Sequence, residues 1–300
     1  MTEVLRFATR LQAEDFVVAD HRVHGVRIMP GVAFLDMVWR LLDAKGYDPT
    51  RVEIRDVLFS EAVALAGGET RRIVIEATAR DNVWEVVARS RIEDRAEAAW
   101  SENFRCRVHF GWAGNEAGNP APFDAKGVAV LAMDEVYARA RAVEIDHAAR
   151  MRMTGEIRKT ASAAEASLAL TLEAAEYETD YIVHPAVLDT ATLVPFVFRD
   201  PARITKPYIP LSIERVILVG PVEGPVLVRV THDPANDEGG DLLFHDYVLC
   251  DPAGRTLVRV ERLCAKQIRN ATGLTPPVKR VVPGKATRPA MPVSPASRGD

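Results

Sequence analysis

The chain has 300 residues, of which 48% are hydrophobic and 27% are charged, as is typical of a globular protein in water. The formal net charge is −4, and the region from Arg269 onward carries six Lys or Arg against one Asp. Residues 1–268 therefore hold about −9, which does not fit a nucleic-acid-binding domain, because such domains are normally basic.

Neither the N-terminus nor any later stretch indicates export or membrane insertion. Charges interrupt the first residues, and no apolar run approaches the roughly 18–20 residues of a membrane span. The three cysteines are Cys106, Cys250 and Cys264, an odd number without a CxxC pair. We therefore expect a reducing compartment without a disulfide framework, and hence a cytoplasmic protein. Cys250 and Cys264 lie in apolar runs, where we expect buried thiols.

Residues 1–112 are predicted to form one unit, a buried helix with a set of strands. Residues 4–19 indicate a strand that ends in the apolar run 16–19. A turn with His and Gly then leads through Pro30 into residues 32–42, which are apolar on nearly every side, as in a buried helix. Asp36 and Arg40 stand four apart there and can pair. We expect strands over residues 52–59, 62–66, 72–77, 84–89 and 104–112.

The second unit repeats this pattern over residues 127–268, after a Gly- and Pro-containing linker at 113–126. Pro185 opens a second apolar helix, and Pro195 limits its length. We expect a further short helix over 132–142 and strands over 151–158, 166–174, 212–219, 226–230, 242–249 and 256–268. Residues 269–300 have many prolines and few large apolar groups, which is typical of a flexible tail. The sequence therefore predicts an α+β fold in which two antiparallel sheets each surround a buried central helix.

Two motifs carry the chemistry. The pattern His21-x-x-x-Gly25-x-x-x-x-Pro30 resembles the HxxxGxxxxP signature of polyketide synthase dehydratase domains, and His184-Pro185-x-x-x-Asp189 resembles the HPxxxD of their second half. Residues 247–255 are similar to their late hairpin, so the resemblance covers roughly residues 5–268. It implies a double hot-dog fold, two helix-wrapping sheets side by side, which agrees with the two-unit pattern.

The resemblance pairs His21 as the base with Asp189 as the acid. An unperturbed imidazole titrates near pH ~6.5, which suits removal of the α-proton of a 3-hydroxyacyl thioester. Asp189 stands among apolar residues, so we expect burial to raise its pKa and let it hold a proton for the departing hydroxyl. The free N–H groups where the Gly31 helix begins would receive the thioester oxygen.

Two departures from the family pattern concern a residue that normally helps hold the aspartate carboxyl and a tyrosine that usually assists near the substrate hydroxyl. The family usually has Gln or His four residues after the aspartate, where this chain has Leu193. Its YGPxF segment falls on residues 147–151, which keep none of those residues. The tyrosine of that segment is absent, unless His147 takes its place. We expect His184 to orient the turn before its helix and His24 to be structural. The residues predicted on the substrate side are Gly25, Pro30, Gly31, His147, His184 and Leu193.

The sequence thus predicts a dehydratase domain of a modular polyketide synthase that gives the 2,3-enoyl thioester. Its substrate would arrive on the phosphopantetheine arm of an acyl carrier protein. We expect neighbouring synthase domains and a second copy in a homodimer as partners, with no nucleic acid, membrane, cofactor or metal. A pyran-forming cyclase, a double-bond isomerase and a catalytically silent dimerisation domain remain open as alternatives. A hot-dog thioesterase is disfavoured, because the His-Gly-Pro turn suits elimination better than hydrolysis.

Overall fold

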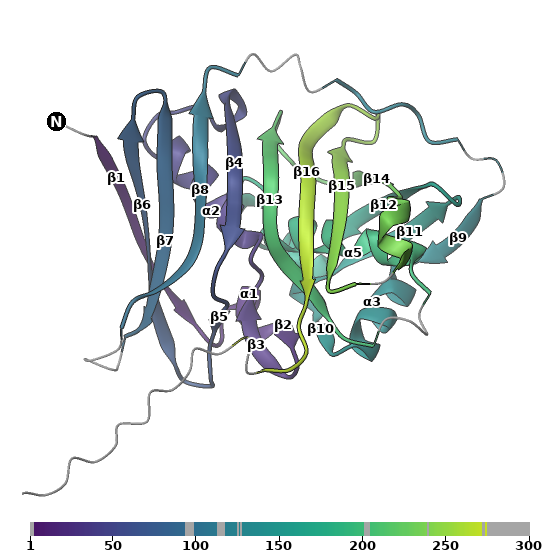
Figure 1. The fold of residues 1–300 in the computed structure, drawn as a ribbon, viewed down its shortest axis with the longest axis horizontal. Helices are drawn as coiled ribbons and strands as arrows, with labels where there is room; N and C mark the ends of the chain where they lie inside the picture. Colours follow the sequence, from purple (N-terminus) through teal and green to yellow (C-terminus); the bar gives the residue numbers. More distant parts are fainter. Residues whose placement is uncertain are drawn as a thin grey trace, which may run out of the picture.

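The computed structural model describes residues 3–93, 99–112, 118–124, 126, 128–200, 205–238, 240–271 and 274. Its strands form a broad antiparallel sheet that runs from β1 at one edge to β9 at the other, with helices packed behind it (Figure 1). Most of the predicted tail, residues 275–300, lies outside the described residues, as does part of the predicted linker.

The first half of the chain wraps five strands around helix α2 (Ala33–Asp43). Eight of the eleven residues of α2 are buried, as the apolar pattern predicts. Strand β7 alternates regularly between buried and partly exposed residues, which is the two-residue period of a sheet with one face on a core. The five strands, in spatial order, are β1 (Val4–Gln12), β6 (Thr70–Arg80), β7 (Val83–Ile92), β8 (Ser101–Phe110) and β4 (Val52–Phe59).

The second half packs seven strands around helix α5 (Pro185–Leu193), which is also almost entirely buried. Helix α3 (Met133–Ala142) lies beside it and buries one face only. The seven strands, in spatial order, are β13 (Tyr208–Leu218), β16 (Thr256–Gln267), β15 (Leu242–Cys250), β14 (Val226–Thr231), β12 (Ala163–Leu170), β11 (Met153–Lys159) and β9 (Ala129–Ala132). Short 3₁₀ turns are η1 (Pro49–Arg51), η3 (Ala149–Met151), η4 (Glu178–Asp180), η5 (Val194–Phe198) and η7 (Pro234–Glu238).

The two halves are joined by strand pairing at two places. Antiparallel pairing of β4 with β13 unites both sets of strands into one sheet of twelve. A smaller sheet contains β10 (Ile145–His147), β2 (His21–Val23), β3 (Val26–Met29) and β5 (Val63–Ala64), in that order. Strand β10 of the second half pairs with β2 of the first, and α2 contacts α5. The predicted double hot-dog arrangement is confirmed, and both central helices meet at this junction.

Two predicted strand ends are wrong, because short helices replace them. The apolar run at 16–19 forms α1 (Phe16–Ala19), in which the Ala19 N–H donates to the Asp15 carbonyl. The end of the strand predicted at 166–174 becomes α4 (Leu172–Ala175), whose first turn is capped by the Thr171 hydroxyl. Apolar runs this short do not by themselves distinguish a strand from one helical turn.

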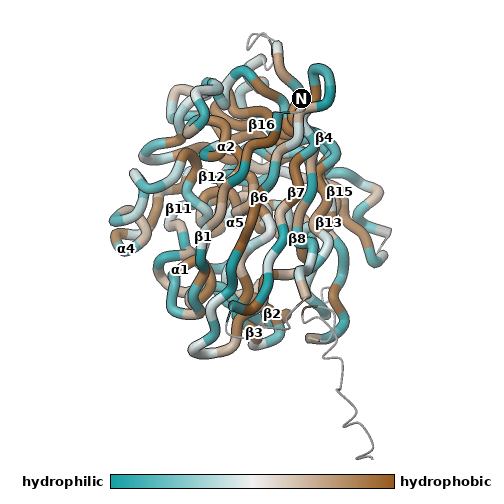
Figure 2. Tube along the Cα trace, turned by 90° about the vertical axis from the view of Figure 1, so that its left-hand side faces the viewer, coloured by the Kyte–Doolittle hydropathy of each residue, from teal (hydrophilic) through white to brown (hydrophobic). Residues whose placement is uncertain are grey.

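Hydrophobic residues concentrate on the inner strands and on the central helices, whereas the peripheral turns are largely hydrophilic (Figure 2). All three cysteines are free and buried, which confirms the prediction for Cys250 and Cys264. Among the described residues, no helix combines the length and the apolar character needed to cross a membrane.

Candidate active site

A tight hairpin fixes the orientation of His21 at the start of β2. Its two-residue turn has positive φ angles at His24 (50°) and Gly25 (73°), the conformation that favours glycine and matches the twist of the strands. The His21 Nδ1–H donates to the Ile28 carbonyl on β3 over 2.9 Å. This hydrogen bond places the hydrogen on Nδ1 and leaves Nε2 with a free lone pair.

Asp189 projects from the middle of α5 toward this imidazole. Pro185 starts the helix, and His184 caps it, with Nδ1 accepting from the Ala186 N–H at 3.1 Å. The Asp189 Oδ2 atom lies 3.9 Å from His21 Nε2, and both residues are only 5% exposed. The structure therefore brings the predicted pair together across the junction of the two halves.

His147 completes a buried group of three. It lies directly opposite His21 in the pairing of β10 with β2, so both side chains leave the same face of the small sheet. Its Nε2 atom is 2.7 Å from Asp189 Oδ2, and the two imidazole ring centres are 5.0 Å apart. An ionised carboxylate can only accept, so we assign the hydrogen of His147 to Nε2.

The charge of Asp189 differs from the expectation that this residue holds a proton at rest. Burial lowers the pKa of His21 below its ordinary value, which keeps the imidazole neutral. Burial alone raises the pKa of Asp189, but attraction to the His21 imidazole whenever it is protonated and the hydrogen bond from His147 outweigh it, so the pKa lies below its ordinary value. The prediction of a raised pKa was wrong because it considered only the apolar neighbours along the helix. The resting site holds a neutral base beside an ionised carboxylate.

These side chains line a cavity of about 200 Å³ that also contains Pro30, Gly31 and Leu193. A Cβ atom at Gly31 would lie 2.9 Å from the ring of Phe59, so only glycine allows this close approach. Within the described part of the chain the Gly31 N–H has no hydrogen-bond acceptor. It stands just before α2, where free N–H groups and the helix dipole favour a negatively charged oxygen.

The sequence did not indicate most of the other residues that line this cavity, among them Asn103, Tyr208 and Lys266. Asn103 donates from Nδ2 to the Glu61 carbonyl, while its buried Oδ1 has no partner among the described residues. Tyr208 and the exposed Lys266 lie along the same cavity wall. All three lie on strands, where nothing in the local pattern separates a cavity residue from an ordinary one.

Two histidines of the motifs have other positions. His184, predicted on the substrate side, is not among the residues that line the cavity; its ring stacks on Phe16 at 5.4 Å, and burial lowers its pKa to about 4. His24 contacts Glu144 and donates from Nε2 to the Ile268 carbonyl, which is a structural role. Gly25, also predicted on the substrate side, is not among the residues that line the cavity; its positive φ serves the turn.

The same three residues form the one potential metal cluster found among the described residues. The ligand atoms of His21, His147 and Asp189 lie within 4.8 Å of one another, and two imidazoles with a carboxylate can bind a transition metal. A metal on His147 Nε2 would, however, move the ring hydrogen to Nδ1, which is buried with no partner within the described part. The hydrogen bond to Asp189 instead keeps the hydrogen on Nε2, where it has an acceptor.

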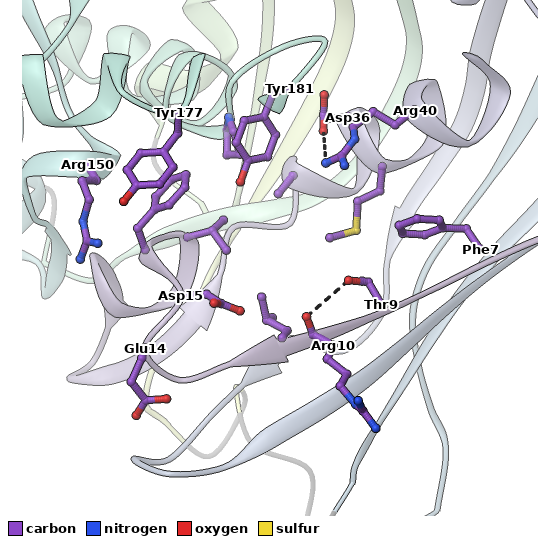
Figure 3. Close-up of a pocket in the computed structure, with 16 residues that line it drawn as sticks. Phe7, Thr9, Arg10, Glu14, Asp15, Asp36, Arg40, Arg150, Tyr177 and Tyr181 are labelled. Atoms are coloured by element: carbon purple, nitrogen blue, oxygen red, sulfur yellow. Dashed lines mark hydrogen bonds and ion pairs between the residues drawn. The ribbon is translucent and has the colours of Figure 1, made fainter. Parts of the chain in front are cut away.

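A second, larger cavity of about 380 Å³ lies between β1, α1 and α2 (Figure 3). Asp36 borders it; its Oδ1 accepts from the Ile182 and Val183 N–H groups at 2.8 and 3.0 Å. The predicted pair with Arg40 is present, with 3.7 Å between the charged atoms. None of the described residues that line this cavity is a histidine, so the paired imidazole and carboxylate of the predicted motifs belong to the smaller cavity.

Comparisons with known proteins agree with this geometry. The family model described as "Polyketide synthase dehydratase domain" matches residues 1–91, and the one described as "Polyketide synthase dehydratase N-terminal domain" matches residues 117–275. Polyketide synthase PksN of Bacillus subtilis is 22% identical over 284 residues, which cover 91% of this chain and 5% of that protein. The chain therefore spans a small part of the curated relatives that it matches.

Solved structures show the same fold. An N-terminal dehydratase from the difficidin assembly line has a TM-score of 0.77 and 24% identity, with 90% of this chain and 95% of that chain covered. The dehydratase domain from the CurK module of curacin polyketide synthase has a TM-score of 0.78 and 18% identity, with 88% and 93% covered. Two further CurK structures are described as inactive mutants, one with histidine replaced by phenylalanine and one with aspartate replaced by asparagine.

Proposed function

The chain belongs to the polyketide synthase dehydratase family, whose domains are hydro-lyases that act on 3-hydroxyacyl thioesters, and we propose that its own substrate is a 3-hydroxyacyl chain on the phosphopantetheine arm of an acyl carrier protein. The product is the 2,3-enoyl thioester. The observation that carries this proposal is the buried group of His21, Asp189 and His147 in one cavity with a free Gly31 N–H.

His21 is the base in this reaction. Its neutral Nε2 removes the α-proton, and the charge that develops on the thioester oxygen is stabilised by the Gly31 N–H at the start of α2. Loss of one such donor typically costs on the order of 10²–10³ in rate. Since His21 and Gly31 border the same cavity, one bound thioester can contact both residues at once.

Asp189 is the acid, but it receives its proton during the reaction. The proton taken from the α-carbon passes from the His21 imidazolium to Asp189 Oδ2, 3.9 Å away in the resting site. The Asp189 carboxyl then gives it to the β-hydroxyl, the carbon–oxygen bond breaks, and water leaves as the double bond forms. His21 is again neutral and Asp189 again ionised, so the reaction needs no cofactor. The inactive histidine and aspartate mutants of the CurK domain support a mechanism with one residue of each type.

Mass spectrometry of a 3-hydroxyacyl pantetheine thioester, incubated with the chain, tests the activity. Loss of one water mass supports dehydration, and a substrate with a distal hydroxyl distinguishes it from ring closure, which gives a cyclic isomer of the enoyl product. His21→Ala and Asp189→Asn should each abolish water loss while the unfolding transition is retained. Normal turnover in either variant would contradict the assigned roles, and no reaction of either stereoisomer on a cognate carrier would support the silent-domain alternative.

We also propose that the partners are an acyl carrier protein, neighbouring synthase domains and a second copy of the chain. The small share of PksN that the chain covers supports further domains in the natural protein. Lys266 on the cavity wall is exposed and can contact the phosphate of a phosphopantetheine arm. Light scattering tests the dimer; one related dehydratase is described as monomeric, and a monomer here would contradict the proposal.

A further inference from the structure

We propose that His147 is a positioning residue, which holds the Asp189 carboxylate in its reactive orientation and performs the task that residue 193 cannot. This inference rests on the proposed role of Asp189. In the described part of the chain, His147 is the one side chain that donates a hydrogen bond to this carboxylate, over 2.7 Å. Leu193, one helical turn after Asp189, offers no donor.

His147 is itself held firmly. The Ala148 N–H donates to the Asp20 carbonyl at 2.8 Å, directly beside the paired His147 and His21. The Asp20 carboxylate also pairs with Arg150 at 2.8 Å, so both strands are fixed next to the site. The ring of Tyr137 packs against the imidazole with 5.3 Å between ring centres. A donor anchored on β10 therefore sets the position of a carboxylate on α5.

The unpartnered Nδ1 of His147 is consistent with positioning. It is buried and has no hydrogen-bond partner among the described residues, so the ring makes a single polar contact, which is to Asp189. Burial of an unpaired polar atom is costly, so a histidine that served only to fill space would be less stable here than an apolar side chain. The contact with Asp189 accounts for a histidine at this place.

Replacement of His147 by phenylalanine keeps a ring of similar shape and removes the donor. We expect kcat to fall about 10²-fold, the cost of a displacement of roughly 1 Å of a reacting group, while KM changes little. His245→Phe is the matched control: His245 is also buried but lies on β15, outside the residues that line the cavity, and its replacement should leave kcat unchanged.

A second substitution should restore the activity. Position 193 stands four residues after Asp189 and lines the same cavity, and side chains at this spacing share one helix face. A glutamine there can donate to the carboxylate from the helix itself. The double variant His147→Phe with Leu193→Gln should therefore regain at least 10-fold in kcat over His147→Phe alone. A merely structural defect of His147→Phe would not be repaired by a polar group at position 193.

A measurement without substrate separates this inference from the proposed function. The carboxyl ¹³C resonance of Asp189 should titrate at higher pH in His147→Phe than in the unchanged chain, because the hydrogen bond that favours the ionised form is lost. Equal titration, or full activity in a folded His147→Phe, would overturn the positioning role and leave the dehydratase proposal intact. An unchanged chain that fails to dehydrate would overturn the proposed function, while the titration would still decide the inference.

Discussion

Asp36, the buried carboxyl of the first central helix, should make stability depend on pH in a way that asparagine removes. Its side chain is 1% exposed beside the larger cavity and borders Arg40 (Figure 3). Burial raises its pKa from 3.8 to about 6, and the two backbone N–H donors and Arg40 only partly oppose this. The Asp36→Asn variant keeps an oxygen for the Ile182 and Val183 N–H groups and carries no charge.

The direction of the pH effect on the unfolding free energy follows from proton binding to Asp36. A carboxyl with a raised pKa in the folded state binds its proton more tightly there than in the unfolded chain. Its contribution to the unfolding free energy is therefore present below pH 3.8 and is lost as the pH rises through about 6. A difference of about two pKa units corresponds to about 3 kcal/mol. Relative to the unchanged protein, Asp36→Asn should gain about this much stability between pH 4 and pH 7.

Urea unfolding of both proteins across this pH range measures the difference. Asp134→Asn is a suitable control, since the Asp134 carboxylate is exposed at the start of α3. The reasoning is refuted if the stability difference between Asp36→Asn and the unchanged protein stays constant from pH 4 to pH 7. A change of the same size in the control would show that the effect reflects the overall charge and has no specific link to burial.

Three further results are expected. Because burial lowers the pKa of His21, kcat/KM should fall only below pH 6.5 and stay level above it; a fall with rising pH near neutrality would mean that Asp189 must carry a proton at rest. Gly31→Ala should lower kcat at least about 10-fold and destabilise the fold by about 1–3 kcal/mol, since its Cβ meets Phe59, and turnover with urea unfolding checks both effects. Burial lowers the pKa of His245 to about 4, so stability should be lost as the pH falls from 6.5 to 4; His245→Gln should remove about 3 kcal/mol of this loss in urea unfolding.

The sequence predicted the central helices because their burial depends on local pattern, whereas the pairing of His21 with Asp189 was implied by the resemblance of the two motifs to a family. Residues 32–42 and the run after Pro185 are apolar on nearly every side, so their burial follows without knowledge of partners. The turn at Gly25 places His21, and the helix places Asp189. The joining of β4 to β13 has no such local signal, because either strand would pair with any suitable edge.

The contact between His147 and Asp189 could not be read from the chain. The two residues are 42 positions apart and meet because β10 pairs with a strand of the other half. The same pairing decides the charge of Asp189, since both imidazoles reach it from the small sheet. Apolar neighbours along a helix predict burial correctly, but they cannot show which charged or hydrogen-bonding groups approach from elsewhere.

The two central helices show how neighbouring groups set the charge of a buried carboxyl. Asp36 and Asp189 are both buried carboxyls on apolar helices, yet burial raises the pKa of Asp36 to about 6, while two histidines bring that of Asp189 below its ordinary value. The oxygen of Asp36 that faces backbone N–H groups has no neighbour from which to take a proton. Asp189 has His21 at 3.9 Å, an imidazole that can take a proton and pass it on. The neighbours supplied by the opposite half, rather than the depth of burial, therefore determine which carboxyl can act as an acid.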